Sequence, residues 1–460
     1  MKHLMAVILA AGEGKRMKSK TSKVVHKACG KPLIQWVYNA VEEAGIKQAV
    51  LVVGHKAEQV IECMGDKVRY VTQEKQLGTG HAVMQAEEYL KDMEGIVVVL
   101  CGDTPLITGE TLSRTIKLHK ESNNSATVIT AILKDPSGYG RIIRDEEGNV
   151  EKIVEQRDAS DEEKAICEIN SGIYCFNVKE LLDSLKELKN DNDQGEYYLT
   201  DTLEILIKKG LKVGAVIADN ESEIMGINDR VQLSLASELL RMRVLNRCMQ
   251  EGVTIIDPKA TYIDAGVRIG TDTIIYPGAI IEGDTEIGEE CIIGPNTRIT
   301  DSKIGNCVEI QNSVIVESTV GDDSKIGPFA YLRPGSSLGR KVKVGDFVEI
   351  KKSVIGDKTK IPHLSYVGDA EVGRNVNLGC GTVVVNYDGK KKHKTIIGDN
   401  AFVGCNSNLV SPVVINNNSY IAAGSTITEE VPENSLAIAR SRQIIKEDWV
   451  NKKGMKREEK

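Results

Sequence analysis

Residues 263–299 read IDAGVR IGTDTI IYPGAI IEGDTE IGEECI IGPNTR I, so an isoleucine returns at every sixth position. No α-helix, with a period of about 3.6, and no ordinary β-strand, with a period of about 2, explains this repeat. It fits one flat side of a parallel β-solenoid, in which the aliphatic anchor points into the core and a small or left-handed residue turns the corner. After a slip of a residue or two, the anchors continue as Ile304, Ile310, Val316, Val320, Ile326, Leu332, Leu338, Val344, Ile350, Ile355, Ile361, Val367, Val372, Leu378, Val384, Ile397, Val403, Leu409, Ile415, Ile421 and Ile427.

The solenoid predicted by this ladder is interrupted once. Three sides make a coil, so the anchors predict about nine coils, and stacked strands about 4.8 Å apart give a prism about 40 Å long. Between Val384 and Ile397 the chain inserts residues 386–389 and the basic run 390–394. Loops that leave a solenoid are often functional. This loop could reach a neighbour's groove or the phosphates of coenzyme A, or be a solvated basic tip.

Composition limits the class of protein. The chain has 460 residues, 41% of them hydrophobic, which allows two or three soluble domains. Its longest apolar runs, Met5–Ala11 and Ile96–Cys101, are too short to span a bilayer, and we read the first as a strand. Ten scattered cysteines without a CxxC pair suit reduced thiols in a cytoplasmic protein. A net charge of −7 argues against a dedicated nucleic-acid binder.

The N-terminal part begins with a strand, a glycine loop and a helix. The apolar strand Met5–Leu9 runs into AAGEGKRM, residues 10–17, and an amphipathic segment begins at Pro32. Glycines let backbone N–H groups approach a phosphate, and basic side chains neutralise it. The loop lacks the Ser/Thr of a Walker A motif, since Arg16 follows the lysine, and Met17 replaces the third glycine of a dinucleotide fingerprint. A phosphate-binding loop and a tight turn with a solvated basic rim both remain open.

Strands and helices alternate through this part of the chain. Strands are predicted at Val50–Val53, Val68–Thr72 and Ile96–Leu100, with helices at Pro32–Ala44 and Thr111–Lys120. This order is typical of an α/β domain with a mainly parallel sheet.

Four polar or glycine positions follow predicted strands. They are Gly12, Gln73, Gly78 and Asp103. Ligands of parallel sheets bind beyond the carboxyl ends of the strands, so these residues can converge on one crevice. Asp103 is either a turn former or a ligand for Mg²⁺, a cation that prefers oxygen.

Residues 231–251 are predicted to form a helical connector. Apolar residues recur there at helical spacing, as in a packing strut: Val231, Leu235, Leu239, Met242, Leu245 and Met249.

Histidine is scarce, and only His363 and His393 lie in the solenoid. A zinc hydratase on this scaffold needs three histidine ligands for each site, so that function is disfavoured. His363 could be structural, or it could serve as a base at neutral pH. Four polar residues around His363 are separated from one another by about a coil or less: Arg333, Lys351, Tyr366 and Asn377. They could stack along one edge of the prism and offer cations and hydrogen bonds to a sugar phosphate.

The order of several motifs resembles that of the sugar-nucleotide pyrophosphorylases. These motifs are LAAGEGKRM with Lys23, QLGTGHA (76–82), GDTPL (102–106), GYGRI (138–142), VEQ (154–156), NSG (170–172) and GIN (226–228). Followed by the hexapeptide ladder, the whole chain resembles the bifunctional N-acetylglucosamine-1-phosphate uridylyltransferase/glucosamine-1-phosphate acetyltransferase family.

The resemblance implies an architecture. Residues 1–230 would form a Rossmann-like α/β uridylyltransferase domain with a mainly parallel sheet, 231–251 a helical linker, and 252–460 a left-handed parallel β-helix acetyltransferase domain. It also implies a homotrimer assembled through the β-helix.

The resemblance further implies a uridylyltransferase site. Arg16 and Lys23 would act on the phosphates, and Asp103 and Asn228 would bind Mg²⁺. The residues expected to bind UTP and UDP-N-acetylglucosamine are Leu9, Ala10, Ala11, Gly12, Lys23, Gln73, Gly78, Thr79, Cys101, Gly102, Asp103, Gly140, Glu155, Asn170 and Asn228. Cys101 departs from the aromatic or small polar residue common there, and we expect a backbone-level contact that tolerates the change.

For acetyl transfer, the resemblance assigns His363 as the base. Glucosamine-1-phosphate would bind Arg333, Lys351, Tyr366 and Asn377. Acetyl-CoA would bind Cys380, Asn386, Tyr387, Cys405, Ala423 and Arg440. Cys380 and Cys405 depart from the alanine and serine that are common in the family, and acetyl transfer is slower here if the serine hydroxyl matters.

The expected function is therefore a two-site cytoplasmic enzyme. It would acetylate glucosamine-1-phosphate with acetyl-CoA and then use UTP and Mg²⁺ to make UDP-N-acetylglucosamine for the bacterial envelope. The alternatives are a monofunctional sugar-nucleotide pyrophosphorylase with a structural or regulatory β-helix, and a purely structural or binding solenoid. The second leaves the ordered phosphate-loop motifs unexplained.

Overall fold

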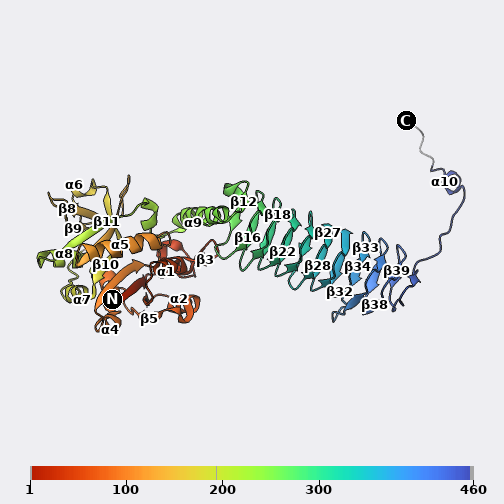
Figure 1. The fold of residues 1–460 in the computed structure, drawn as a ribbon, viewed down its shortest axis with the longest axis horizontal. Coiled ribbons are helices and arrows are strands. Elements are labelled where there is room, and N and C mark those ends of the chain that lie inside the picture. Colours follow the sequence, from red (N-terminus) through yellow and green to blue (C-terminus); the bar gives the residue numbers. More distant parts are fainter. Residues whose placement is uncertain (1–2, 193, 456–460) are drawn as a thin grey trace, which may run out of the picture. The chain divides into compact units, whose positions relative to one another are not determined.

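The computed structural model describes residues 3–192 and 194–455 (Figure 1). The chain divides into two compact units, Met1–Arg243 and Val244–Lys460. Each has its own hydrophobic interior and is described by itself. Among the described residues, no helix has the length and apolar character needed to cross a membrane.

The first unit is built on a mainly parallel sheet. Its strand order is β11-β7-β10-β6-β1-β4-β5, with β8 and β9 attached to β10. Strand β1 pairs in parallel with β4 and β6, whereas β10 runs antiparallel to β6 and β7. The strands are β1 (His3–Ala10), β4 (Ala49–Val53), β5 (Arg69–Thr72), β6 (Gly95–Cys101), β7 (Ala126–Ile132), β8 (Arg141–Arg144), β9 (Val150–Val154), β10 (Glu168–Asn177) and β11 (Val213–Ile217), and β2 (Lys27–Ala28) pairs with β3 (Lys31–Pro32).

Helices cover both faces of this sheet. Alternate residues of β1 enter opposite cores, with Ala6 and Ile8 on one side and Met5 and Val7 on the other. The helices are α1 (Leu33–Glu43), α2 (Ala57–Met64), α3 (Thr79–Met84), α4 (Glu87–Leu90), α5 (Gly109–Glu121), α6 (Asp161–Lys164), α7 (Val178–Leu185) and α8 (Asp201–Lys208). The predicted α/β class and the five predicted strands and helices between Pro32 and Lys120 are confirmed to within two residues at each end.

The predicted connector is a single helix, α9 (Arg230–Gln250), but its predicted apolar stripe is wrong at the start. Val231 and Leu235 are 79% and 48% exposed. In this part of α9 the buried residues are instead Ala236 and Leu240, which pack with Leu33 and neighbouring residues of the first unit. A small alanine allows close packing, a signal that a search for large apolar residues overlooks.

The second unit is a three-sided parallel β-solenoid (Figure 1). In the described residues its faces contain 11, 10 and 9 strands, so the solenoid starts before and ends after the predicted ladder, at β12 and β41. Short α10 (Trp449–Lys452) follows it. The anchors point inward as predicted, for example Ile281, Ile293 and Ile299, each 0% exposed.

One predicted anchor is wrong. Val316 is only half-buried, and Ile315 occupies the core position between Ile299 and Leu332. The corner between Ile310 and this strand is one residue shorter than usual. The inward position therefore falls one residue earlier in the sequence, at 315 and not at 316.

The first two faces carry the strands nearest His363. The first face contains β12 (Thr254–Ile255), β15 (Ile274–Ile275), β18 (Ile292–Ile293), β21 (Glu309–Ile310), β24 (Lys325–Ile326), β27 (Lys343–Asp346), β30 (Lys360–His363), β33 (Asn377–Leu378), β36 (Phe402–Val403), β39 (Tyr420–Ile421) and β41 (Leu436–Ala437). The second contains β13 (Tyr262–Ile263), β16 (Ile280–Glu282), β19 (Arg298–Thr300), β22 (Val314–Val316), β25 (Tyr331–Leu332), β28 (Glu349–Lys351), β31 (Tyr366–Gly368), β34 (Val383–Val385), β37 (Asn408–Val410) and β40 (Thr426–Ile427).

The third face contains β14 (Arg268–Ile269), β17 (Glu286–Ile287), β20 (Lys303–Ile304), β23 (Thr319–Val320), β26 (Ser337–Leu338), β29 (Val354–Ile355), β32 (Ala370–Val372), β35 (Thr395–Ile397) and β38 (Val413–Ile415). The predicted loop leaves the solenoid between β34 and β35. It is a small hairpin in which Tyr387 bridges to Lys392.

Replacing an anchor should destabilise the solenoid far more than replacing its neighbour on the same strand. Ile281 is 0% exposed and Ile280 is 37% exposed, both on β16. We expect Ile281→Ala to lower the free energy of unfolding by about 2–5 kcal/mol, through lost burial and a residual cavity. The matched control Ile280→Ala should cost much less. Urea unfolding followed by circular dichroism measures both, and equal losses would contradict the inward assignment of Ile281.

Candidate functional site

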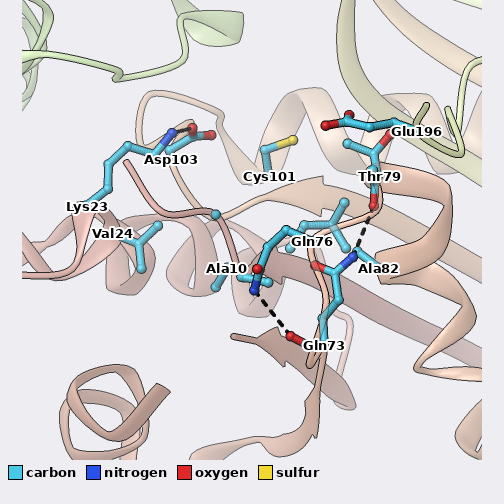
Figure 2. A pocket seen from close by; sticks show the side chains of 14 residues that line it. Ala10, Lys23, Val24, Gln73, Gln76, Thr79, Ala82, Cys101, Asp103 and Glu196 are labelled. Atoms are coloured by element: carbon cyan, nitrogen blue, oxygen red, sulfur yellow. Dashed lines mark hydrogen bonds and ion pairs between the residues drawn. The ribbon is translucent and has the colours of Figure 1, made fainter. Parts of the chain in front are cut away.

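The carboxyl ends of β1, β5 and β6 border a pocket of about 240 Å³ in the first unit (Figure 2). The predicted residues that line it are Leu9, Ala10, Ala11, Gly12, Lys23, Gln73, Gly78, Thr79, Cys101 and Asp103. These residues come from distant parts of the chain and meet because parallel strands end at one edge of the sheet. Gly102 lies beside the pocket, its backbone N–H donating to the Leu9 carbonyl at 2.8 Å.

The glycine loop turns directly over Lys23. Gly14 has φ +65°, and a Cβ there would lie 2.8 Å from Cβ of Lys23. A larger residue would therefore be strained and would displace the lysine. Gly12 has open space around its Cα, which leaves the backbone accessible to a ligand. Arg16 is exposed on the short 3₁₀ turn Lys15–Met17 and is not among the pocket-lining residues.

Lys23, Asp103 and Asn228 form a polar triad. The Lys23 ammonium contacts Oδ2 of Asp103 and lies 3.3 Å from Oδ1 of Asn228. Figure 2 shows the lysine reaching the aspartate at one side of the pocket. Two oxygens from separate segments thus converge on a positive charge. A carboxylate and an amide oxygen, completed by substrate phosphates and water, suit Mg²⁺.

The opposite wall of the pocket contains two glutamines. Nε2 of Gln73 donates to the Gly78 carbonyl at 3.1 Å, and Nε2 of Gln76 donates to the Gln73 carbonyl at 3.3 Å (Figure 2). Gly78 must lack a side chain, because a Cβ there would lie 2.6 Å from the Tyr197 carbonyl. This wall offers amide groups that can hydrogen-bond a nucleotide base.

Sequence reasoning missed four pocket residues: Val24, Gln76, Ala82 and Glu196. Gln76 begins the QLGTGHA motif and could have been included. Glu196 is far away in the sequence and comes to the pocket because the neighbouring Tyr197 exchanges backbone hydrogen bonds with Leu77 and Gly80. No sequence pattern signals this contact.

Cys101 ends β6 beside the triad. Burial, with the nearby Asp103 carboxylate, raises the pKa of the Cys101 thiol to about 12. The thiol is therefore neutral at physiological pH and is a poor nucleophile.

Gly140, just before β8, and Glu155, just after β9, meet Asn170 of β10 outside the lining of the pocket itself. Asn170 donates from its backbone to the Gly140 carbonyl at 2.9 Å, and a Cβ on Gly140 would lie 3.3 Å from Oε1 of Glu155. Gly172, two residues after Asn170, brings this group toward Cys101, since a Cβ there would lie 3.6 Å from the Cys101 sulfur. Burial, with the Asp158 and Asp201 carboxylates, raises the pKa of Glu155.

In the second unit, Arg333 and Lys351 stack at the same position of successive coils, each one residue after its anchor. Tyr366 begins the next strand of this face. Asn377 lies on the first face, paired with Lys360, so the four predicted sugar-phosphate residues occupy two faces and not one edge. Arg333 donates to Oε1 of Glu349 at 2.8 Å, and Lys351 Nζ lies 3.4 Å from Oδ2 of Asp369.

His363 ends β30 at the corner between these two faces. Its side chain is 55% exposed, which excludes a role inside the core. Its Nδ1 lies 2.9 Å from Oδ1 of Asp346.

Cys380, Cys405 and Ala423 share one column. Each lies two residues after a paired anchor, in the coils that follow His363. Backbone hydrogen bonds join the coils here, from Asn406 to the Cys380 carbonyl at 2.7 Å and from Gly424 to the Cys405 carbonyl at 2.8 Å. Arg440 is exposed beyond this column, just after Ala439 bonds to the coil of Thr426.

The inserted loop is attached beside Lys351. Asn386 is buried and its Nδ2 donates to Oδ2 of Asp369 at 2.5 Å, while Tyr387 is exposed. Lys392 of this loop lines a groove of about 320 Å³, and the neighbouring Lys351 ammonium lowers the pKa of Lys392. Two ammonium groups held this close favour an anion between them. The sequence did not predict Lys392 as a site residue, although the interrupted ladder predicted the loop that contains it.

Comparisons with known sequences agree with both units. A nucleotidyl transferase family model matches residues 5–224, and a bacterial transferase hexapeptide (six repeats) model matches residues 266–301 and 394–429. The predicted fold class, a nucleotidyltransferase domain followed by a left-handed parallel β-helix, is confirmed.

Full-length relatives are also similar. The chain is 69% identical over its whole length, and over the whole relative, to the Bifunctional protein GlmU of Acetivibrio thermocellus. It is 60% identical to the same-named protein of Caldanaerobacter subterraneus subsp. tengcongensis, covering 98% of this chain and 99% of that one. For Clostridioides difficile the identity is 56%, with 98% of both chains covered. These matches, with both sites on one chain, show that this protein belongs to the bifunctional GlmU family, the family that the sequence motifs predicted.

Proposed function

We propose that the pocket at the carboxyl ends of β1, β5 and β6 carries out uridylyl transfer and that the β-helix surface around His363 carries out acetyl transfer. The chain is a uridylyltransferase and acetyltransferase of UDP-N-acetylglucosamine biosynthesis. The observation that supports this division is that each unit has its own polar site. One contains the triad of Lys23, Asp103 and Asn228, and the other has an exposed histidine near stacked cations.

In uridylyl transfer, a phosphate oxygen of N-acetylglucosamine-1-phosphate attacks the α-phosphorus of UTP and diphosphate leaves. The protein positions two anions that repel each other. Lys23 and the backbone of the Gly12 loop hold the nucleotide phosphates, with Arg16 closing from the exposed side. Gly140, Glu155 and Asn170 hold the sugar. Loss of one such cation costs about 3 kcal/mol, or about a hundredfold in rate.

Asp103 and Asn228 are the residues that would hold Mg²⁺. The ion would neutralise phosphate charge that the protein's own cations leave uncompensated. Lys23, which contacts both oxygens, is then available to the phosphates.

In acetyl transfer, His363 accepts a proton from the amino group of glucosamine-1-phosphate. Arg333, Lys351 and Lys392 provide positive charge for its phosphate, and Tyr366 and Asn377 hold the sugar. The column of Cys380, Cys405 and Ala423 lies in the next coils beyond His363, with Asn386, Tyr387 and Arg440 around it, and acetyl-CoA is proposed to lie along it.

A homotrimer working in the cytoplasm is part of this proposal. It is supported by an apolar ridge at the corner beside His363, formed by Phe329, Phe347 and Leu364, which are 56%, 60% and 60% exposed. The two rings stack with centroids 5.5 Å apart. All three residues have positive φ, a conformation that bulky side chains rarely adopt. A second copy covering this ridge would lie next to His363.

Crossed variants of the full chain test the division of labour. His363→Ala should remove all but a residual rate of acetyl transfer and leave uridylyl transfer unchanged, because the base lies in the other unit. Asp103→Asn should do the reverse. Coenzyme A thiol release and diphosphate release measure the two rates. Equal loss of both activities in either variant would refute separate sites.

Removal of one proposed metal ligand should change the metal requirement. Asn228→Ala is expected to raise the Mg²⁺ concentration for half-maximal uridylyl transfer about tenfold or more, since an oxygen ligand is lost. Titration of diphosphate release with Mg²⁺ measures this, and acetyl transfer in the same variant is the internal control. An unchanged Mg²⁺ titration would contradict the assignment.

The ridge should control assembly. Phe347→Asn removes the exposed ring but suits a φ of +58°, so the coil should remain folded. Light scattering should show the mass of the wild type, three chains of 50.3 kDa, fall toward one chain. Acetyl transfer should fall with it and uridylyl transfer should persist. Lys341→Asn, at another corner with φ +59°, is the matched control. A fully active acetyltransferase of one-chain mass would contradict the shared site.

A further inference from the structure

Two strands of the first face are extended beyond the usual corner. Their neighbours β24 and β33 contain two residues, whereas β27 and β30 contain four. The extension continues the parallel pairing past the anchors, so that Asp346 lies directly opposite His363. The two side chains therefore occupy neighbouring positions on the same side of the strand pair.

A glycine permits this close pairing. A Cβ on Gly345 would lie 1.8 Å from the carbonyl oxygen of Pro362, a distance that no side chain could tolerate. The extended segments Gly345–Asp346 and Pro362–His363 therefore approach each other only because residue 345 has no side chain. The paired backbone therefore fixes the Cα positions from which the side chains of Asp346 and His363 extend.

The contact itself defines the state of the ring. Nδ1 of His363 lies 2.9 Å from Oδ1 of Asp346. A hydrogen bond from its own backbone amide, together with the contact with His363, lowers the pKa of Asp346, so it is a carboxylate at neutral pH. A carboxylate only accepts hydrogen bonds, so in the neutral imidazole Nδ1 carries the proton and Nε2 has a free lone pair.

Within a single chain, packing does not fix the orientation of the His363 ring. The side chains of His363 and Asp346 are 55% and 43% exposed. The nearest charged groups on the same strands, Lys343 and Lys360, are outward-facing residues of the flat face. The second histidine of the solenoid differs, because its partner Asp388 also accepts from the backbone of Lys390 and Lys391 and so closes the inserted loop.

We propose that Asp346 is the positioning residue for His363 in acetyl transfer. It holds the imidazole in the tautomer whose Nε2 faces the sugar amine, and it stabilises the imidazolium formed during the reaction. The proposal rests on the function assigned to His363 above.

Acetyl transfer releases two protons from the sugar ammonium, and His363 carries one of them. The ammonium of the sugar loses two protons while its nitrogen forms a bond to the acetyl carbon and the carbon–sulfur bond breaks. One proton passes through Nε2 of His363 to the leaving thiolate and gives coenzyme A. The other passes to solvent. Asp346 remains a carboxylate throughout.

Graded variants of the full chain test the proposal. Asp346→Ala removes the acceptor, and we expect it to lower kcat for acetyl transfer by about 10- to 100-fold. The KM for glucosamine-1-phosphate should change by less than about twofold, since Asp346 does not touch substrate. Asp346→Asn keeps an acceptor oxygen without the charge and should fall between. Uridylyl transfer should be unchanged. The matched control is Asp323→Asn, at an exposed corner of an earlier coil.

A double variant separates positioning from scaffolding. In the His363→Ala background, Asp346→Ala should cause no further loss, because a residue acting through His363 has nothing left to position. A wild-type kcat in Asp346→Ala, an equal loss in both backgrounds, or a raised KM with a lowered melting temperature would each overturn the proposal. Substantial acetyl transfer by His363→Ala would instead overturn the function assigned to His363 itself.

Discussion

Backbone hydrogen bonding between successive coils is the constraint on which the second unit depends. Each coil has little interior of its own and is held by its neighbours, so a side chain's place is set by its count from an inward anchor. Arg333 and Lys351 stack for this reason, as do Cys380, Cys405 and Ala423. The first unit uses another constraint, because parallel strands ending at one edge bring Gly12, Gln73 and Asp103 together.

The sequence was most informative where a physical period or a strand end determines position. The six-residue anchors predicted the solenoid because core volume tolerates little else at those positions. In the pocket of the first unit, Gly12, Gln73, Gly78 and Asp103 followed from their places just after strands, whereas the other predicted lining residues followed from the family resemblance. The predictions were wrong by one residue at positions where the sequence pattern did not show a local change in the number or size of residues. A corner shorter by one residue moved the anchor from Val316 to Ile315, and Ala236 replaced larger residues on the buried side of α9.

Contacts between distant segments could not be read from the sequence. Glu196 joins the pocket through backbone bonds made by its neighbour Tyr197, and Asn377 lies on a different face from Lys351 because faces alternate with every anchor. Asp346 is an ordinary polar residue in the printed sequence. Only the extended register of β27 and β30 and the missing side chain at Gly345 show that it meets His363.

The apolar ridge of Phe329, Phe347 and Leu364 also affects how the protein is made. In the proposed homotrimer, a newly synthesised chain exposes this apolar ridge from the time its solenoid folds until other copies cover it. The time for which the ridge stays exposed then depends on how soon the chain meets other copies. Translation of many copies from one messenger RNA would shorten this time, whereas chains at low concentration would stay exposed to chaperones and proteases. In that assembly, the amount of folded enzyme would depend on the rate of its own synthesis.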